Sequence, residues 1–345
     1  MRQHRVAIVG ATGLVGQEFI KVLEQRDFPM ASVKLLASDR SAGRKLFVRH
    51  QEIEVEETIP ESFGGIDIAL FSAGSDISRR FSPIAASAGA VVIDNSAAFR
   101  MDRSVPLVVP EVNPEDIRWH QGIIANPNCS TIQMVVALYP LHRANPIKRV
   151  VVDTYQSVSG TGSAAVEELT TQTRQVLAGQ AAVPSVYPHQ IAFNVLPEID
   201  VFLDNAYTRE EWKLVEETRK IMHAPEIVVS ATCVRVPVFT GHSEAVNVEF
   251  SRPMSSDEAR ELLAAAPGVK VLDDPSVSLY PQAWLAAGTD EVYVGRIRQD
   301  ASHPNGLAMW VVSDNLRKGA ALNTVQIAEE MIRRDWLSRG GRQDG

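Results

Sequence analysis

Short apolar segments alternate with helix-like stretches through the first 130 residues, and this alternation strongly limits the folds that the chain can adopt. The apolar segments have the length of strands, and the segment from Leu14 to Gln25 has the apolar spacing of a helix. The predicted strands are Val6–Val9, Val33–Ala37, Ile68–Phe71, Val91–Asp94 and Ile123–Ala125. Strands that alternate with helices form a parallel sheet with helices on both faces. The sequence therefore predicts a doubly wound α/β domain.

The pattern changes beyond Cys129, where longer segments carry period-2 or continuous β-branched patterns. These strand candidates are Arg149–Gln156, Ile227–Val238, Ser243–Phe250, Val292–Gln299 and Ala308–Ser313. With the helices between them, they predict an α+β domain on a mixed or antiparallel sheet. The length of 345 residues also favours two domains.

A last helix is predicted from about Ala320 to Arg334. Its apolar residues Ala321, Val325, Ala328 and Ile332 share one helical face, so this helix must pack on another element. The glycine-containing end, residues 338–345, is expected to be a flexible tail.

Charge and hydropathy exclude two classes of partner. The net charge is −8 and the basic residues are scattered, which argues against binding to nucleic acid. No apolar run reaches about 18 residues, so no membrane span is predicted. The strand-like segment Val6–Val9 begins too early for a cleavable signal peptide, and we expect a cytoplasmic protein.

Three glycines, Gly10, Gly13 and Gly16, lie between the first predicted strand and the first helix in VAIVGATGLVG. Glycines at this point let the backbone approach a pyrophosphate, which then binds the N–H groups at the start of the helix. The spacing is GxxGxxG rather than GxGxxG, and a tight chain reversal is the alternative explanation. The position of the loop at the start of an alternating α/β domain favours a dinucleotide site.

The segment ASDRSAGRK after the second strand contains residues suited to either dinucleotide. Asp39 could accept hydrogen bonds from the ribose hydroxyls of NAD. Residues that could instead hold the 2′-phosphate of NADP are Ser38, Arg40, Ser41 and Arg44. Position alone leaves the choice open, and the two arginines could also be solvated surface charges.

The chain has two cysteines, Cys129 and Cys233, which are too few for a disulfide framework and lack the spacing of a zinc site. No metal site is predicted. Cys129 follows the polar turn Asn126–Pro127–Asn128 and begins an apolar-periodic helix, where the helix dipole stabilises a thiolate. Cys233 lies within a predicted strand and is typical of a buried structural thiol. Cys129 is therefore the candidate nucleophile.

Eight histidines could serve as the base for this thiol: His4, His50, His120, His142, His189, His223, His242 and His303. His242 is the best placed, because it follows a glycine in a predicted turn between two long strands. A structural histidine is the common alternative, and position alone does not decide between them.

Ordered motifs along nearly the whole chain resemble those of aspartate-semialdehyde dehydrogenases. The motifs are GATGLVG, ASDRSAG, FSAGS, VPLVVPEVN, NPNCSTIQM, TYQSVSGTG, IAFNVLPEID, EEWKLVEET, SATCVRVPV, GHSEAV, VGRIR and SDNLRKGAALNTVQIAE. The resemblance implies a Rossmann-type dinucleotide-binding domain at residues 1–129, completed by a C-terminal helix at 320–337. It also implies a homodimer, with a catalytic and dimerisation domain at 130–319 that resembles the C-terminal domain of glyceraldehyde-3-phosphate dehydrogenase.

The resemblance also implies roles for single residues. Cys129 matches the nucleophile, His242 the acid/base and Gln156 the residue that orients the acyl intermediate. The expected substrate-binding residues are Arg235 for the carboxylate, Glu210 for the amino group, Arg100 and Lys213 for the phosphate, and Asn128. Glu217 and Lys220 repeat the spacing of Glu210 and Lys213, so the second pair stays an alternative.

The expected cofactor is NADP(H), because the family pattern ASxRSAG tolerates a variable residue at Asp39. Its expected contacts are Gly10, Ala11, Thr12, Gly13, Leu14, Val15, Gly16, Ser38, Arg40, Ser41, Ser72, Ala73, Gly74, Ser159, Gly160 and Asn315.

The expected reaction is the NADPH-dependent reduction of L-aspartyl 4-phosphate to L-aspartate 4-semialdehyde and phosphate, by way of a thioester on Cys129. Such a reaction serves lysine, threonine and methionine biosynthesis. Two alternatives are N-acetylglutamyl-phosphate reductase, which shares the architecture, and a non-catalytic relative. The second is disfavoured because such relatives lack the cysteine.

Overall fold

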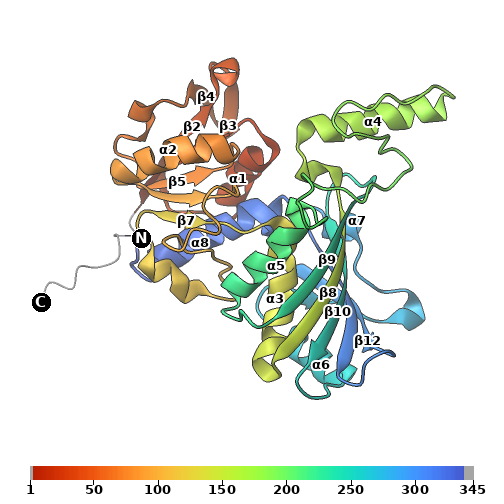
Figure 1. Ribbon diagram of the computed structural model, residues 1–345. Coiled ribbons are helices and arrows are strands. Elements are labelled where there is room, and N and C mark those ends of the chain that lie inside the picture. The colour runs from red at the N-terminus through yellow and green to blue at the C-terminus, as the bar shows by residue number, and fades with distance from the viewer. Residues whose placement is uncertain (1–2, 338–345) are drawn as a thin grey trace, which may run out of the picture. The chain divides into compact units, whose positions relative to one another are not determined.

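The computed structural model describes residues 3–337, and the chain divides into two compact units (Figure 1). The first unit runs to Asn128 and resumes at Ala320, and the second is Cys129–Gly319. The predicted tail at 338–345 lies outside the described residues. No helix in the described part of the chain is long and apolar enough to cross a bilayer.

The first unit contains a seven-stranded sheet with the strand order β3-β4-β2-β1-β5-β6-β7. Its strands are β1 (His4–Val9), β2 (Met30–Ala37), β3 (Lys45–Val48), β4 (Gln51–Glu57), β5 (Ile68–Phe71), β6 (Val91–Asp94) and β7 (Ile123–Ala125). All neighbours pair in parallel except β3 and β4, which form an antiparallel hairpin. The parallel sheet was predicted from the sequence, whereas the hairpin was not.

Helices cover both faces of this sheet, because alternate residues of its strands are buried on opposite sides. Val6 and Ile8 of β1 pack in one core with α1 (Leu14–Gln25) and α8 (Leu322–Arg333). Ala7 and Val9 point to the opposite core, which is completed by α2 (Ser75–Ser87). This arrangement confirms the doubly wound prediction.

The last helix differs in its bounds from the prediction of Ala320 to Arg334 and from the domain limit of 337. A π-helix at Arg317–Ala321 precedes α8, which ends at Arg333. Asp335 adopts a left-handed φ of 57°, and the Trp336 N–H donates to the Met331 carbonyl, as in a Schellman termination. The predicted apolar face is confirmed, since Ala321, Val325 and Ala328 are buried and Ile332 packs against the same core.

The second unit contains a six-stranded sheet with the order β11-β12-β13-β10-β8-β9. Its strands are β8 (Ile147–Gln156), β9 (Val228–Arg235), β10 (His242–Phe250), β11 (Val269–Val271), β12 (Val292–Gln299) and β13 (Gly306–Ser313). The pairs β8/β9 and β11/β12 are parallel and the others antiparallel, which confirms a mixed sheet. The prediction that β9 extends to Val238 was wrong, because Pro237 has no N–H to continue the ladder.

Three helices of the second unit pack on one face of its sheet: α3 (Cys129–Ala144), α5 (Arg209–Ile221) and α6 (Ser256–Ala264) (Figure 1). The residues from Ser130 to Leu138 are buried on every side of α3, which makes it the central helix of this unit. The other helices of the second unit are α4 (Ser163–Leu177), α7 (Ala283–Ala286) and the 3₁₀ helices Val158–Gly160 and Pro275–Val277. The first unit also has the 3₁₀ helices Asp39–Ser41, Pro60–Phe63 and Pro114–Trp119.

Candidate active site

Strand register places four polar side chains in one row across the inner face of the second sheet. Gln156 on β8 pairs with Arg235 on β9, and His242 on β10 pairs with Ser313 on β13. The pairing of Tyr155 with Ser243 puts Gln156 beside His242. The row therefore runs Arg235, Gln156, His242, Ser313, and all four residues are buried. Three of the four were predicted as site residues.

Cys129 is the first residue of α3, the helix that packs on this face of the sheet, as predicted. A Cβ atom added to Gly319 would lie 2.9 Å from the Cβ of Cys129, so only glycine permits this close approach. Cys233 is fully buried on β9, and burial raises the pKa of its thiol well above the ordinary value. Within residues 3–337 neither cysteine forms a disulfide. Cys129 is partly exposed at the start of a helix, which suits a nucleophile, and its catalytic role stays a prediction.

His242 is the first residue of β10 and is fully buried, which corrects its predicted place in a turn. The reason is that Gly241, with φ of 94°, completes the turn one residue earlier. The backbone N–H of Ser157 donates to Nδ1 of His242 over 3.1 Å. Because a backbone N–H can only donate, the neutral ring carries its proton on Nε2.

Burial lowers the pKa of His242 to about 3, and the positive charge of Arg235 adds to this effect. The imidazole is therefore neutral near pH 7. Among the described residues, Nε2 has no hydrogen-bond partner. A Cβ atom at Gly160 would lie 3.2 Å from Nε2, so this glycine leaves space beside the proton. The ring is placed to donate a hydrogen bond from Nε2 to a reacting group.

Asn315 holds the backbone around His242 in place. Its Oδ1 accepts from the N–H of Gly241 over 2.9 Å and from the hydroxyl of Ser157 over 3.0 Å. Its Nδ2 donates to the Ser159 hydroxyl over 2.9 Å. Sequence reasoning missed Ser157 and Gly241, although both lie inside the motifs that it used. Ser159 and Asn315, predicted as cofactor contacts, belong to this buried network, and their contact with a cofactor stays a prediction.

The positively charged side chain of Arg235 lies near His242. Its Nη1 donates to the Ser157 carbonyl over 2.7 Å, and the Tyr187 ring centroid lies 6.0 Å from its Cζ. In the described chain its buried Nε has no hydrogen-bond partner. A buried guanidinium with an open N–H is suited to a carboxylate, which it can bind through two parallel hydrogen bonds.

Glu210 of α5 connects to the row through Gln156. The Gln156 Nε2 donates to Glu210 Oε1 over 3.2 Å, and Lys213 Nζ lies 3.0 Å from both Glu210 Oε2 and Asp200 Oδ2. This contact with the row favours the pair Glu210 and Lys213 over the alternative pair one helical stretch later. The threonine cap of α5 at Thr208, closed by Glu211, fixes where the helix begins.

The first unit contains a cavity of about 420 Å³ beside the glycine loop. A Cβ atom at Gly10 would lie 2.2 Å from the Ser72 carbonyl oxygen, and one at Gly16 would lie 2.2 Å from the Gly10 oxygen. Gly10 also has φ of 88°, so the loop requires glycine there. The loop thus forms a backbone cradle that fits a dinucleotide pyrophosphate.

Several predicted cofactor contacts line this cavity: Gly10, Thr12, Gly13, Ser38, Ser72 and Ala73. Arg40 and Ser41 lie in the 3₁₀ helix that begins at Asp39, and Gly74 precedes α2. Ala11 and Gly16 are buried, Leu14 begins α1, and Val15 packs against the core. The sequence did not predict the other wall, which consists of Glu57, Thr58, Ile59, Ile77, Arg80 and Phe81.

Two predicted substrate residues, Arg100 and Asn128, belong to the first unit. Arg100 is buried, and its Nη2 donates to the Asn95 carbonyl over 2.8 Å. Asn128 is also buried and immediately precedes Cys129. Their roles in substrate binding stay predictions.

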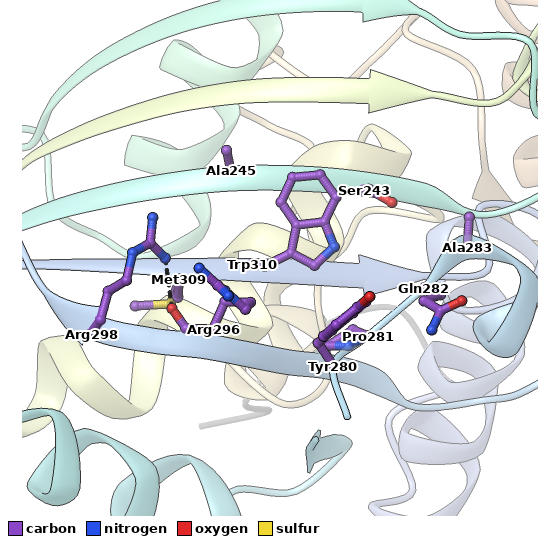
Figure 2. A pocket seen from close by; sticks show the side chains of 10 residues that line it. All are labelled: Ser243, Ala245, Tyr280, Pro281, Gln282, Ala283, Arg296, Arg298, Met309 and Trp310. Carbon is purple, nitrogen blue, oxygen red and sulfur yellow. Dashed lines mark hydrogen bonds between the residues drawn. The ribbon is translucent and has the colours of Figure 1, made fainter. Parts of the chain in front are cut away.

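A second cavity of about 630 Å³ lies on the other face of the second sheet, away from α3. Figure 2 shows the Trp310 indole over the strands, with Tyr280 to Ala283 on one side and Arg296 and Arg298 on the other. Trp284 in the adjoining α7 is 89% exposed. The sequence patterns gave no indication of this hollow, because its walls come from segments far apart in the chain.

Comparison with known proteins gives matches along nearly the whole chain. A family model described as "Semialdehyde dehydrogenase, NAD binding domain" matches residues 5–120, and "Semialdehyde dehydrogenase, dimerisation domain" matches residues 138–318. The chain is 57% identical to an aspartate-semialdehyde dehydrogenase of Aquifex aeolicus, covering 96% of this chain and 98% of the relative. It is 54% identical to that of Bacillus subtilis, covering 94% and 96%.

Solved structures give the same result. Aspartate semialdehyde dehydrogenase II of Vibrio cholerae, complexed with ASA, superposes with a TM-score of 0.94 at 48% identity, covering 96% of this chain and 99% of that one. A Candida albicans aspartate semialdehyde dehydrogenase with NADP superposes with a TM-score of 0.77 at 29% identity, covering 97% and 99%. A nicotinamide dinucleotide is therefore the cofactor class that these similarities support.

Proposed function

Because the chain belongs to the aspartate-semialdehyde dehydrogenase family, we propose that it reduces L-aspartyl 4-phosphate to L-aspartate 4-semialdehyde and phosphate with NADPH, reversibly. The observation that carries this proposal is the row Arg235, Gln156, His242 on the sheet face where α3 begins with Cys129. A nucleophile, a proton donor and a carboxylate-binding guanidinium are the groups that this reaction needs.

In the first step the Cys129 thiolate, stabilised at the start of α3, attacks the acyl carbon of the substrate. A carbon–sulfur bond forms and the carbon–oxygen bond to phosphate breaks, which leaves a thioester. Arg100 and Lys213 are the proposed phosphate-binding cations. Lys213 also contacts two carboxylates, Glu210 and Asp200, so it would hold the phosphate while remaining ion-paired.

In the second step the thioester carbon is reduced, and the bound cofactor supplies the hydride. The Nε2–H of His242 stabilises the negative charge that develops on the carbonyl oxygen bound to this carbon. The carbon–sulfur bond then breaks, the aldehyde leaves, and the thiolate of Cys129 is restored. Gln156 orients the acyl group, Asn128 contributes to substrate binding, and Arg235 binds the α-carboxylate, which fixes the acyl carbon against the thiol.

We propose NADP(H) as the form of the cofactor. The cavity beside the glycine loop includes Ser38, and the 3₁₀ helix beside it presents Arg40 and Ser41, which together suit a 2′-phosphate. Asp39 lines the same cavity, where a carboxylate would suit NAD. The relative values of kcat/KM for the two dinucleotides, in wild type and in Arg40→Ala, test this choice. NADP preference that is lost in the variant supports the proposal, and a preference for NAD contradicts it.

The proposed substrate is the free amino acid derivative rather than an N-acetylated one. Glu210 is buried beside Gln156 and offers a carboxylate for a substrate ammonium group. The test is phosphate-dependent reduction of NADP with aspartate semialdehyde, run beside N-acetylglutamate semialdehyde. Turnover with the first and not with the second supports the proposal, and the reverse would identify an N-acetylglutamyl-phosphate reductase.

We further propose that the first unit is the dinucleotide-binding domain and that the second is the catalytic and dimerisation domain of a homodimer. The proposed docking face for the second copy is the sheet face with Trp310 and the exposed Trp284. Support comes from the description of the matching family model as a dimerisation domain and from the large exposed apolar side chains there. Sedimentation of wild type and of Trp284→Asp tests this, since a monomeric wild type would contradict it.

A further inference from the structure

Glu244 is a fully buried carboxyl group that the proposed reaction does not use. It lies two residues after His242 on β10, so it points to the same inner face of the sheet. In the adjacent strands Thr154 and Val311 lie opposite it. Glu244 therefore lies one row below Gln156 and His242, where a glutamate is rarely found without a paired charge.

Among residues 3–337, no cation stabilises the ionised form of Glu244. Among the described residues, neither carboxyl oxygen has a hydrogen bond of good geometry. The Gln133 side chain on α3, one helical turn after Cys129, is the polar group that acts on the Glu244 carboxyl, and its Nε2 is also unsatisfied. The carbonyl oxygen of the same amide accepts a 2.7 Å hydrogen bond from the Ser313 hydroxyl.

The neutral form of this acid suits its site. Burial raises the pKa of Glu244 well above its ordinary value, and only Gln133 opposes this shift. The elements packed around it, α3, β8 and β13, present Gln133, Thr154 and Val311, and none of these side chains titrates near neutral pH. The titratable neighbours are His242 on the same strand and the Cys233 thiol on β9, which burial keeps neutral.

We propose that Glu244 is held as the neutral carboxylic acid and positions the start of α3, with Cys129, against the strands that carry Gln156 and His242. This inference rests on the proposed roles of Cys129 and His242. A half-turn of the Gln133 amide lets its oxygen accept the Glu244 proton while its Nε2 donates to Ser313 Oγ. The Glu244 hydroxyl and both polar atoms of the Gln133 amide then have partners, and α3 is tied to β10 and β13.

On its other side, Glu244 is connected through Thr154 to Gln156 of the polar row. Thr154, the cross-strand neighbour of Glu244, accepts a 3.2 Å hydrogen bond from the Gln156 side chain. Glu244 thus lies between the helix that carries the nucleophile and the strand that carries Gln156. We expect its loss to displace these groups relative to one another without removing any of them.

The first test is infrared difference spectroscopy of the unliganded protein near pH 7, comparing wild type with Glu244→Gln. A carboxylic acid carbonyl band that is present in wild type and absent in the variant is expected. Glu249→Gln is the control, because Glu249 on the same strand pairs with Arg149 at the surface and should contribute no acid band. If the band is absent from wild type, Glu244 is ionised and the inference fails, whatever reaction the enzyme catalyses.

The second test is steady-state kinetics of Glu244→Gln and Glu244→Met. The glutamine keeps the shape and the donor of the neutral acid, so its kcat should stay within about threefold of wild type, while the apolar methionine should lower kcat about tenfold or more. KM for aspartate semialdehyde should change little in both, because Arg235 and Glu210 are untouched. Equal losses in the two variants, or wild-type kcat in Glu244→Met, would overturn the positioning role. Retained activity in Glu244→Gln would also show that loss in the methionine variant is not a general effect of mutation.

Discussion

The cavity beside the glycine loop of the first unit is shaped by backbone atoms, whereas the polar row of the second unit consists of side chains. The cavity is shaped by backbone, since the glycine loop approaches Ser72 so closely that Gly10 has no room for a side chain. The row is built from buried side chains on four strands, which only the sheet register brings together. A backbone site is encoded locally and is sensitive to added atoms. A side-chain site is encoded over long range and is sensitive to lost atoms.

The largest expected effect separates the two cysteines of the second unit. Cys129→Ala should reduce phosphate-dependent turnover about 10⁴-fold or more, because the covalent path is lost. Cys233→Ala is the matched control and should keep most of the activity, since that thiol is buried and protonated. Initial rates of NADP reduction with aspartate semialdehyde measure both. Comparable losses in the two variants would contradict the assignment of the nucleophile.

The second-largest effect is expected when Arg235 of the polar row is replaced by another cation. Arg235→Lys should lower kcat/KM for aspartate semialdehyde about 100-fold, because lysine cannot form two parallel hydrogen bonds to a carboxylate. Arg149→Lys, at an exposed ion pair with Glu249, should have no effect on the same quantity. Near-wild-type kcat/KM in Arg235→Lys would remove the carboxylate clamp from the mechanism.

The corresponding change in the first unit adds a methyl group. Gly10→Ala should raise KM for NADP about 30-fold, because the Cβ meets the Ser72 carbonyl and φ is positive. Gly43→Ala has a similar φ of 82° with open space around it, so it isolates the conformational cost. The same KM in both variants would show that the close approach at Gly10 does not shape the cofactor site.

The smallest expected effect is a pH dependence of stability that arises in the row. His242 has a folded pKa of about 3 against an ordinary value of 6.5, so the unfolded chain binds more protons between these values. Stability should therefore fall as the pH drops below 6.5, by about 1.4 kcal/mol between pH 7.5 and 5.5 relative to His242→Gln. Urea unfolding at the two pH values measures it, with the exposed His189→Gln as the control.

The contribution of Glu244 to stability should depend on pH with the opposite sign to that of His242. Its folded pKa is raised above the ordinary value of 4.5, so its contribution to stability is complete below 4.5 and is lost as the pH rises toward the folded value. Wild type should accordingly lose stability relative to Glu244→Gln with rising pH. Parallel pH profiles for His242→Gln and Glu244→Gln would contradict this contrast.

The sequence predicts most of the first unit because its signals are local. The bounds of α1, β5, β6 and β7 agree with the structure, since buried parallel strands are short apolar runs and α1 follows its glycine loop directly. The β3–β4 hairpin was missed because both strands are largely exposed, and the glutamates of β4 mask the alternating Ile53 and Val55. Cys129 was found in the same local way, from a polar turn before an apolar helix.

The rest of the site depends on tertiary pairing that a single sequence does not reveal. The burial of His242 and the acceptor role of its Nδ1 follow from the position of Ser157, 85 residues earlier in the chain. Glu244 looks like an ordinary polar residue of an alternating strand until the packing of α3 buries it. The end of β9 at Arg235 could have been predicted, because Pro237 cannot continue the ladder.

The central claim is that Cys129 carries the acyl group between two half-reactions, and mass spectrometry tests it most directly. The enzyme is mixed with aspartate semialdehyde and NADP in the absence of phosphate, and the protein and its Cys129 peptide are weighed. We predict one acyl adduct on Cys129, formed with one equivalent of NADPH and released when phosphate is added. NADPH formed without an adduct, or an adduct on Cys233, would contradict the account.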